Sequence, residues 1–179
     1  MQFISFHKKI VLPLALSLIL ILIVGFASPV MAVSVGGYVN GGGAISTSEG
    51  KDVFGGNAMT LKIGGVSGTW SHVTASGDHV IGKVEHIVLA NFGPGPSPDP
   101  PSALANVAMF DGSATLNGES GYRFNVIATD YGEPGTSDNY HFILRKVSDS
   151  SVVYDSWGTL SSGDIQIHSP NNGHPWLHT

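Results

Sequence analysis

Apolar and polar residues alternate along most of the chain beyond its first forty positions, which is the pattern of strands with one buried face. In the stretch GYRFNVIATD, the residues Tyr122, Phe124, Val126 and Ala128 fall on one side, and the stretch DNYHFILRKV alternates in the same way. Clusters of glycine, proline, asparagine and serine separate such stretches, and little 3.6-residue periodicity is sustained. The pattern predicts an all-β domain.

The predicted strands follow one another through short turns. Asn117-Gly118 joins two of them, and both residues tolerate a positive φ, as a tight hairpin requires. Short connections make neighbouring strands antiparallel, so we expect an antiparallel meander of eight to nine strands. The strands are predicted at residues 43–47, 52–63, 68–74, 80–91, 105–116, 121–130, 139–147, 152–157 and 164–168.

A meander of this size must protect its two edges, either by closing into a barrel or by folding into two packed sheets. The first predicted strand, GGAIS, and the last, GDIQIHS, are both short, led by glycine and alternating in apolar residues. If these two strands pair, the sheet closes. We therefore expect a closed or nearly closed barrel, with a two-sheet β-sandwich as the alternative.

Two segments fall outside this pattern. Residues 91–103, NFGPGPSPDPPSA, contain five prolines, which cannot donate hydrogen bonds to a strand ladder. This segment is expected to be an exposed loop, either a stiff crossover between strands or a docking lip. Residues 169–179 form a C-terminal tail after the last predicted strand, so the single all-β domain is predicted to span residues 33–168.

The amino terminus has the organisation of a secretory signal peptide. Lys8 and Lys9 precede the apolar run IVLPLALSLILILIVGFA, and Val30 and Ala32 supply the small residues that a signal peptidase needs. We predict a signal peptide at residues 1–32, cleaved after Ala32, and hence a secreted protein that is extracellular or attached to the cell surface. The alternative is an uncleaved N-terminal anchor, because about 18 apolar residues nearly span a bilayer. No second long apolar run follows.

Charge and cysteine content narrow the function classes. Without residues 1–32, six basic residues face thirteen acidic ones, a formal charge of −7. This balance argues against nucleic acid and anionic membrane surfaces, which require basic patches. The chain has no cysteine, which excludes thiol nucleophiles and zinc–thiolate sites. An exported domain without disulfides is typical of prokaryotes, and about 147 residues suffice for one packed core.

Five blocks follow one another in the sequence: GGYVNGGGAI, VFGGNAMTLKIGGVSGTWSHVT, GDHVIGKVEHIVLA, FDGSATLNGESGYRFNVIATDYGEPGTSDNYHFIL and VVYDSWGTLSSGDIQIH. Their succession resembles the post-COAP domain found in secreted bacterial and archaeal proteins, over residues 35–168. The most distinctive parts are D-x-G-E-P-G-x-x-D-x-(aromatic) and G-x-I-x-I-H. The resemblance implies an exported all-β module and leaves its function open. Because the proline segment 91–103 is longer than the resemblance leads us to expect, no site beside it is transferred.

The loop TDYGEPGTSDNYHF is the first candidate site. Asp130, Glu133 and Asp138, with backbone carbonyls of the glycines between them, offer the hard oxygen ligands that calcium takes. The spacing differs from that of an EF-hand, and Pro134-Gly135 also suits the centre of a type II turn. The loop is therefore either a calcium site formed by Asp130, Glu133 and Asp138 or a tight turn.

Histidines give little sign of a metal or catalytic site. Several lie on or beside predicted strands, but no H-x-H or H-E-x-x-H spacing occurs. His79 and His86 lie an odd number of residues apart, so on a regular strand they face opposite sides. We assign no catalytic residue and no histidine ligand.

An enzyme remains the chief alternative reading. No G-x-S-x-G elbow is present, and Glu85 with Asp111 form a candidate carboxylate pair that no motif selects. A small lyase, isomerase or hydrolase would place a histidine, an acid and Tyr122 or Tyr140 at the mouth of the barrel.

Aromatic residues supply the second candidate site. Most repeat at same-side strand positions and are predicted to form the core. Trp157, followed by Gly158 near a strand end, is the best candidate for an exposed residue that binds a ligand such as a carbohydrate. The alternative is a rim residue that closes the barrel. The aromatic set is Trp70, Tyr122, Phe124, Tyr140, Phe142, Tyr154 and Trp157.

Together these features favour an exported, non-catalytic β module that binds or assembles at the cell surface or outside the cell, either with carbohydrate or with another protein. A filament or biofilm-matrix subunit is a further alternative, favoured if the segment VSVGGYV is unpaired and free to add to another sheet.

Overall fold

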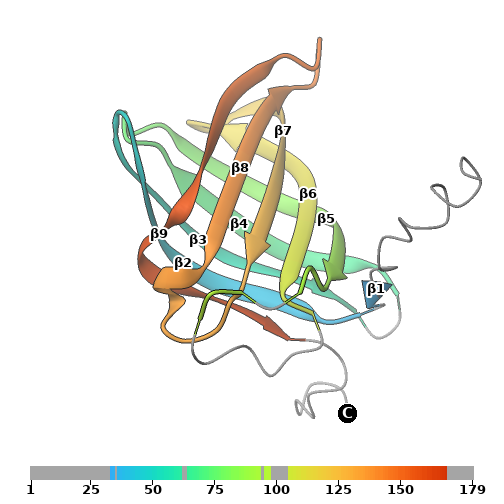
Figure 1. Ribbon diagram of the computed structural model, residues 1–179. Coiled ribbons are helices and arrows are strands. Elements are labelled where there is room, and N and C mark those ends of the chain that lie inside the picture. The colour runs from blue at the N-terminus through green and yellow to red at the C-terminus, as the bar shows by residue number, and fades with distance from the viewer. Residues whose placement is uncertain (1–32, 35, 62–63, 94, 98–104, 169–179) are drawn as a thin grey trace, which may run out of the picture. The chain divides into compact units, whose positions relative to one another are not determined.

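The computed structural model describes residues 33–34, 36–61, 64–93, 95–97 and 105–168 (Figure 1). The predicted signal peptide at residues 1–32, the tail at residues 169–179 and part of the proline segment 91–103 lie outside the described residues. Within the described residues, no helix is long and apolar enough to cross a membrane.

Eight antiparallel strands form a meander that closes into a barrel (Figure 1). Each strand pairs with the next one along the chain, and the first of the eight pairs with the last. The closed all-β barrel predicted from the sequence is therefore confirmed. The strands are β2 (Tyr38–Thr47), β3 (Gly50–Thr60), β4 (Val66–Val73), β5 (His79–Ala90), β6 (Val107–Leu116), β7 (Glu119–Thr129), β8 (Asn139–Lys146) and β9 (Val152–His168).

Two shorter elements accompany the barrel. Strand β1 (Val33–Ser34) pairs antiparallel with the end of β5, opposite Ala90 and Leu89. A single turn of 3₁₀ helix, η1 (Gly135–Ser137), lies in the loop between β7 and β8. The segment VSVGGYV is therefore paired at Val33 and Ser34 and, within β2, at Tyr38 and Val39.

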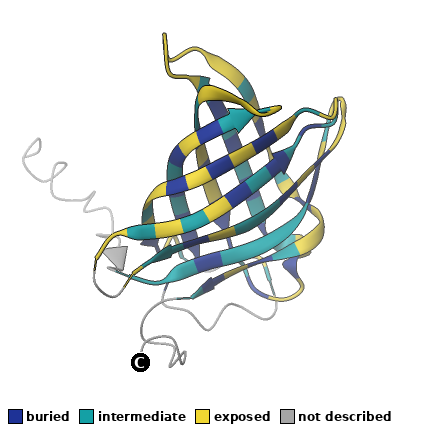
Figure 2. Ribbon diagram, turned by 180° about the vertical axis from the view of Figure 1, so that it is seen from behind, coloured by how far each residue is buried: buried dark blue, intermediate teal, exposed yellow. Residues whose placement is uncertain are grey.

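Side chains along each strand alternate between the interior and the surface. Figure 2 shows buried and exposed residues following one another along the strands of the outer wall. In β7, Phe124, Val126 and Ala128 are buried, as the sequence pattern predicts. A closed barrel of eight strands has an interior just wide enough for its own side chains.

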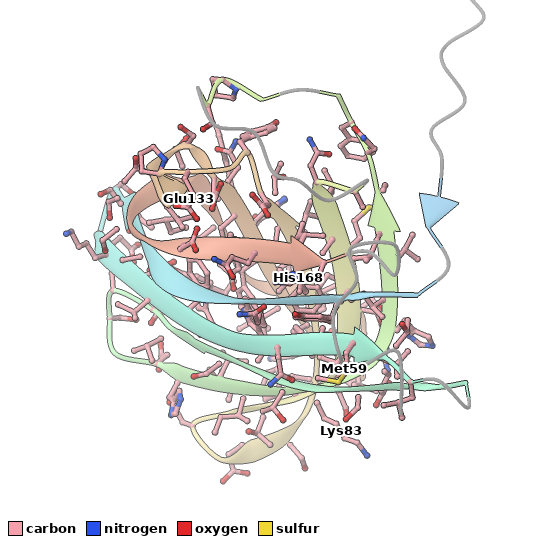
Figure 3. The ribbon with its side chains drawn as sticks, turned by 90° about the horizontal axis from the view of Figure 1, so that it is seen from below. Met59, Lys83, Glu133 and His168 are labelled. Carbon is pink, nitrogen blue, oxygen red and sulfur yellow. The ribbon has the colours of Figure 1, made fainter. Side chains whose placement is uncertain are left out.

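Aromatic rings fill much of this interior (Figure 3). The rings of Phe54 and Tyr140 stack with centroids 3.7 Å apart, and Trp70 meets Phe110 edge-on at 4.8 Å. All four side chains are buried. The core prediction for Trp70 and Tyr140 is therefore confirmed, and these rings leave the centre of the barrel packed.

Glycines at the closing seam explain where the strand predictions differ from the structure. The sequence pattern predicts that the first strand begins at residue 43 and that residues 152–157 and 164–168 form two separate strands, but β2 begins at Tyr38 and β9 runs unbroken from Val152 to His168. A Cβ on Gly43 would collide with the carbonyl of Ser162, and one on Gly163 would collide with that of Gly42. The glycines that resemble turn residues therefore let two backbones approach closely.

Candidate functional site

One polar cluster lies inside the barrel among the aromatic rings. Asp52 and His72 are fully buried, and their side chains approach to 3.3 Å. The hydroxyl of Tyr154 donates to both carboxylate oxygens of Asp52, at 2.9 and 2.8 Å. The Tyr140 hydroxyl accepts a hydrogen bond from the Trp70 indole at 2.9 Å and lies 3.4 Å from His72 Nδ1. This cluster joins four strands, β3, β4, β8 and β9.

Burial controls the protonation of the cluster. It lowers the pKa of His72 to about 4, although Asp52 acts in the opposite direction. It also raises the pKa of Tyr140 well above its ordinary value, and the pKa of Tyr154 rises because of burial and its hydrogen bond to Asp52. At neutral pH the imidazole is therefore uncharged and both phenols keep their protons. Such groups suit a structural network, and the stacking of the His72 ring on Phe142 at 4.1 Å supports that role.

The barrel seam opens at one end, between β2 and β9. Pairing between these strands runs from Tyr38 opposite His168 to Ile45 opposite Leu160 and stops there. Beyond it, β2 turns into β3, while the first half of β9 continues beside β8 (Figure 1). The edge of β9 turned away from β8 thus has no partner strand from Val152 to Thr159 within the described residues.

A hollow of about 370 Å³ occupies this opening. Its walls come from the turn between β2 and β3 and from the unpaired stretch of β9. Hydroxyl and carboxylate groups dominate the lining, and one large aromatic residue stands beside them. The lining residues are Ser46, Thr47, Ser48, Glu49, Tyr154, Asp155, Ser156 and Trp157.

Trp157 is the most solvent-exposed large apolar side chain of the described residues, at 76%. Its strand neighbours Val152 and Val153 are also exposed. The predicted exposure of Trp157 agrees with this placement, but the predicted strand end does not, because β9 continues from Val152 to His168. No second tryptophan or tyrosine of the described residues is exposed beside it, so the stacking surface consists of one ring.

Tyr154 connects the hollow to the interior cluster. It lines the hollow with part of its surface and donates its hydroxyl to Asp52 on the inner side. The wall of the hollow is therefore fixed by a hydrogen bond to a buried carboxylate, which keeps this side of the site in place.

The predicted calcium ligands lie at the opposite end of the barrel, beside the end of β9. Asp130 accepts hydrogen bonds from the backbone N–H groups of Gly132 and Ile167, at 2.8 and 2.9 Å. Asp138 accepts from those of Tyr131 and Ile165, at 2.9 and 3.0 Å. These carboxylates attach the β7–β8 loop to β9.

Glu133, labelled in Figure 3, is exposed on that loop and does not join these contacts. The described residues contain no group of three or more acidic or histidine side chains arranged to hold a metal ion. The calcium site at Asp130, Glu133 and Asp138 stays a prediction of the sequence.

The two buried carboxylates of the loop have unusual acidities. Burial raises the pKa of Asp138 to about 7, and the nearby charges of Asp130 and Asp164 act in the same direction. Burial also raises the pKa of Asp130, with a contribution from Asp164. The hydrogen bonds from the backbone oppose both increases. The loop therefore carries crowded negative charge that its amide partners offset only in part.

The structure brings the candidate carboxylate pair, Glu85 and Asp111, together around the guanidinium group of Arg123. Arg123 binds Glu85 at 3.0 Å and Asp111 at 2.8 Å on the outer surface. His86 adds a contact to Asp111 at 3.0 Å. This is an exposed ion cluster on the outer wall and lacks the cleft that a glycosidase pair requires.

His79 and His86 both face solvent, contrary to the expectation for a regular strand. The register of β5 against β6 shifts between Val84 and His86, and this bulge inserts one residue and restores the outward direction.

The sequence pattern does not predict the interior cluster or the hollow. Asp52 and His72 each stand alone in an alternating strand, and no spacing links them. The hollow depends on where β2 and β9 stop pairing, which no local pattern encodes. The sequence feature that could have indicated the hollow is the run from Val153 to Trp157. Two of its outward residues, Val153 and Trp157, are apolar, and Tyr154 and Ser156 lie between them.

Comparison with protein-family models, with curated proteins and with solved structures finds no match to this chain. The resemblance to the post-COAP domain therefore stays an expectation from the sequence.

Proposed function

We propose that the protein is an exported, non-catalytic β-barrel module that binds an extracellular or cell-surface partner at the hollow beside Trp157. The exposure of this tryptophan at the rim of a polar hollow is the observation that carries the proposal. Indole rings in water lose hydration favourably when a ligand covers them, and they are enriched among residues that dominate binding energy.

The contrast with the interior supports a surface site. Phe54, Trp70 and Tyr140 are buried and stacked on one another, so they leave no space for a substrate in the part of the barrel that they occupy. The hollow, by contrast, combines an aromatic face with hydroxyl and carboxylate groups. These are the groups that recognise a saccharide or a polypeptide backbone.

The test compares Trp157→Ala with Ile127→Ala. Both remove an exposed apolar side chain from the outer wall, but Ile127 does not line the hollow. Binding would be measured by calorimetry against a panel of cell-wall oligosaccharides and a panel of short extended peptides. We expect Trp157→Ala to weaken binding at least about tenfold and Ile127→Ala to leave it unchanged.

Two results would contradict the proposal. One is equal binding by the two variants, which would place the site elsewhere. The other is an absence of binding to either panel by the parent protein. Circular dichroism on both variants verifies that the fold is intact, so that a loss of binding is not a loss of structure.

A second candidate function is catalysis in the hollow, favoured by the contact between Tyr154 and Asp52. In this reading a substrate in the hollow would meet a phenol backed by a buried carboxylate. Turnover of nitrophenyl esters or glycosides that Tyr154→Phe abolishes would establish it. The increased pKa of Tyr154 keeps its phenol protonated at neutral pH, so the phenolate is not available as a base, which is why binding is the first proposal.

A further inference from the structure

The unpaired edge of β9 exposes backbone groups in a defined direction. In an antiparallel ladder, the N–H groups of successive residues point to opposite edges. The Leu160 N–H donates toward the β8 side, to the Asp138 carbonyl at 2.9 Å. On the regular stretch opposite β8, the N–H groups of Ser156 and Gly158 therefore also point to β8. The N–H groups of Asp155 and Trp157 point to the hollow. Two or more strand-type donors therefore face this opening.

This stretch has little of the protection that natural sheets usually give a free edge: Asp155 is its one charged side chain, and a bulge lies opposite Arg145. Exposed strand edges normally carry prolines, inward charges or covering loops, because a free edge accepts other strands. Here Val152, Val153 and Trp157 are exposed along the same stretch, and it contains no proline or lysine. An open edge with exposed apolar side chains is the expected form of a binding site for an extended chain.

The charged side chains that line the hollow indicate which kind of polypeptide would bind beside β9. The lining contributes two carboxylates, Glu49 and Asp155, and no basic side chain. Asp155 also contacts the imidazole of His141, at 2.8 Å. Lys51, the nearest lysine along the β2–β3 hairpin, lies opposite Ser46 on the neighbouring strand. The excess of acidic over basic residues in the chain disfavours a second copy as the partner.

We propose that the edge of β9 from Val152 to Thr159 receives an extended, basic polypeptide segment of a partner protein, which adds as a strand beside β9. The inference rests on the proposed binding function of the hollow and names its ligand class. Backbone hydrogen bonds from the residues around Asp155 and Trp157 hold the added strand. The Trp157 ring covers an apolar side chain of the segment, and Glu49 with Asp155 attract its lysine or arginine side chains.

The probes are fluorescein-labelled octapeptides with lysine at alternate positions and valine, threonine or leucine between them. A second set has the same charge but carries two consecutive prolines at its centre, which remove a donor from each edge of the strand, so it cannot form a regular strand ladder. A third set replaces lysine by glutamate. We expect the first set to bind at micromolar to millimolar concentrations and the other two sets to bind at least about tenfold more weakly.

The decisive variants are Asp155→Pro and Asp155→Ala. Both remove the same carboxylate and its contact with His141, but only proline removes the N–H that faces the hollow. The bonds to β8 are made by the residues on either side, so both variants keep that pairing. We expect Asp155→Pro to bind the lysine peptides at least about tenfold more weakly than Asp155→Ala. Circular dichroism and the melting midpoint verify that both remain folded.

Equal affinity of Asp155→Pro and Asp155→Ala would overturn strand addition, as would equal binding of the proline-containing peptides. The proposed function would still hold if Trp157→Ala abolished binding of a saccharide, because that result locates a site in the hollow with a different ligand. If size-exclusion chromatography showed concentration-dependent association that Asp155→Pro removes, the occupant would be a second copy, and the inference of a basic partner would be wrong.

Discussion

The two halves of β9 belong to one strand but have opposite surroundings. From Leu160 to His168, the strand pairs with β2 and receives contacts from the loop carboxylates Asp130 and Asp138. From Val152 to Thr159, it pairs with β8 alone and exposes Trp157. The half from Leu160 to His168 closes the barrel, and the half from Val152 to Thr159 has one edge without a partner strand among the described residues. A single strand thus supplies the seam of the barrel and, as we propose, a binding edge, because its pairing with β2 ends between the two halves.

The largest effect on stability is expected at the closed half. Asp138→Ala removes the acceptor for the backbone N–H groups of Tyr131 and Ile165 in a buried place. Each buried donor left without a partner costs about 1–3 kcal/mol, so for two donors we expect the free energy of unfolding to fall by about 2–6 kcal/mol. Urea denaturation measures it.

The matched control is Asp155→Ala, which removes an exposed carboxylate from the open half of β9 itself. Its contact with His141 is a surface pair, so a loss of no more than about 1 kcal/mol is expected. Equal losses in the two variants would show that the two halves of β9 do not differ in the way described.

The pH dependence of the free energy of unfolding distinguishes Asp138 in the β7–β8 loop from His72 in the interior cluster. The pKa of Asp138 is about 7 in the folded protein and 3.8 ordinarily, so its contribution is present in full below about pH 4 and is lost as the pH rises to about 7. The pKa of His72 is about 4, below its ordinary 6.5, so its contribution is lost as the pH falls through that range. The two slopes oppose each other between about pH 4 and pH 6.5.

Asp138→Asn removes the pH dependence that Asp138 contributes to stability and leaves the pH dependence that His72 contributes. Its free energy of unfolding should increase with pH over that window more steeply than that of the parent, by about 1 kcal/mol or more. Denaturation at about pH 4.5 and about pH 6.5 measures the difference. Parallel curves for parent and variant would show that Asp138 titrates as an ordinary carboxyl group.

A smaller effect is expected in the interior cluster. Tyr140→Phe keeps the stacked ring but removes the oxygen that accepts the Trp70 indole N–H. The buried donor then lacks its partner, and we expect a loss of about 1–3 kcal/mol in unfolding free energy. Phe142→Leu at a neighbouring core position is the comparison for packing alone. A Tyr140→Phe variant as stable as the parent would mean that the indole finds another acceptor.

The fold was predictable because alternation records burial directly. Phe124, Val126 and Ala128 alternate in the sequence and are buried in the barrel. The unbroken β9 was not predictable, because glycines such as Gly163 serve equally in turns and in closely approaching strands. The sequence allowed the exposure of Trp157 to be proposed. It could not predict the hollow beside this residue, because the hollow depends on the register of β2, which is set by the whole barrel.

The smallest expected effect concerns calcium at the loop that anchors the closed half. Asp130 and Asp138 offer carboxylate oxygens, but each oxygen already accepts a buried backbone N–H, and Glu133 is exposed apart from them. Calcium takes six to eight oxygen ligands, and preferential binding to the folded state must raise the melting midpoint. We expect calcium to shift the midpoint of residues 33–179 by less than about 2 °C relative to EDTA. A larger rise that Glu133→Gln reduces, while the fold stays intact, would instead establish the calcium site predicted from the sequence. Glu133 is the informative position, because its carboxylate is not committed to the backbone and its loss does not by itself weaken the anchor.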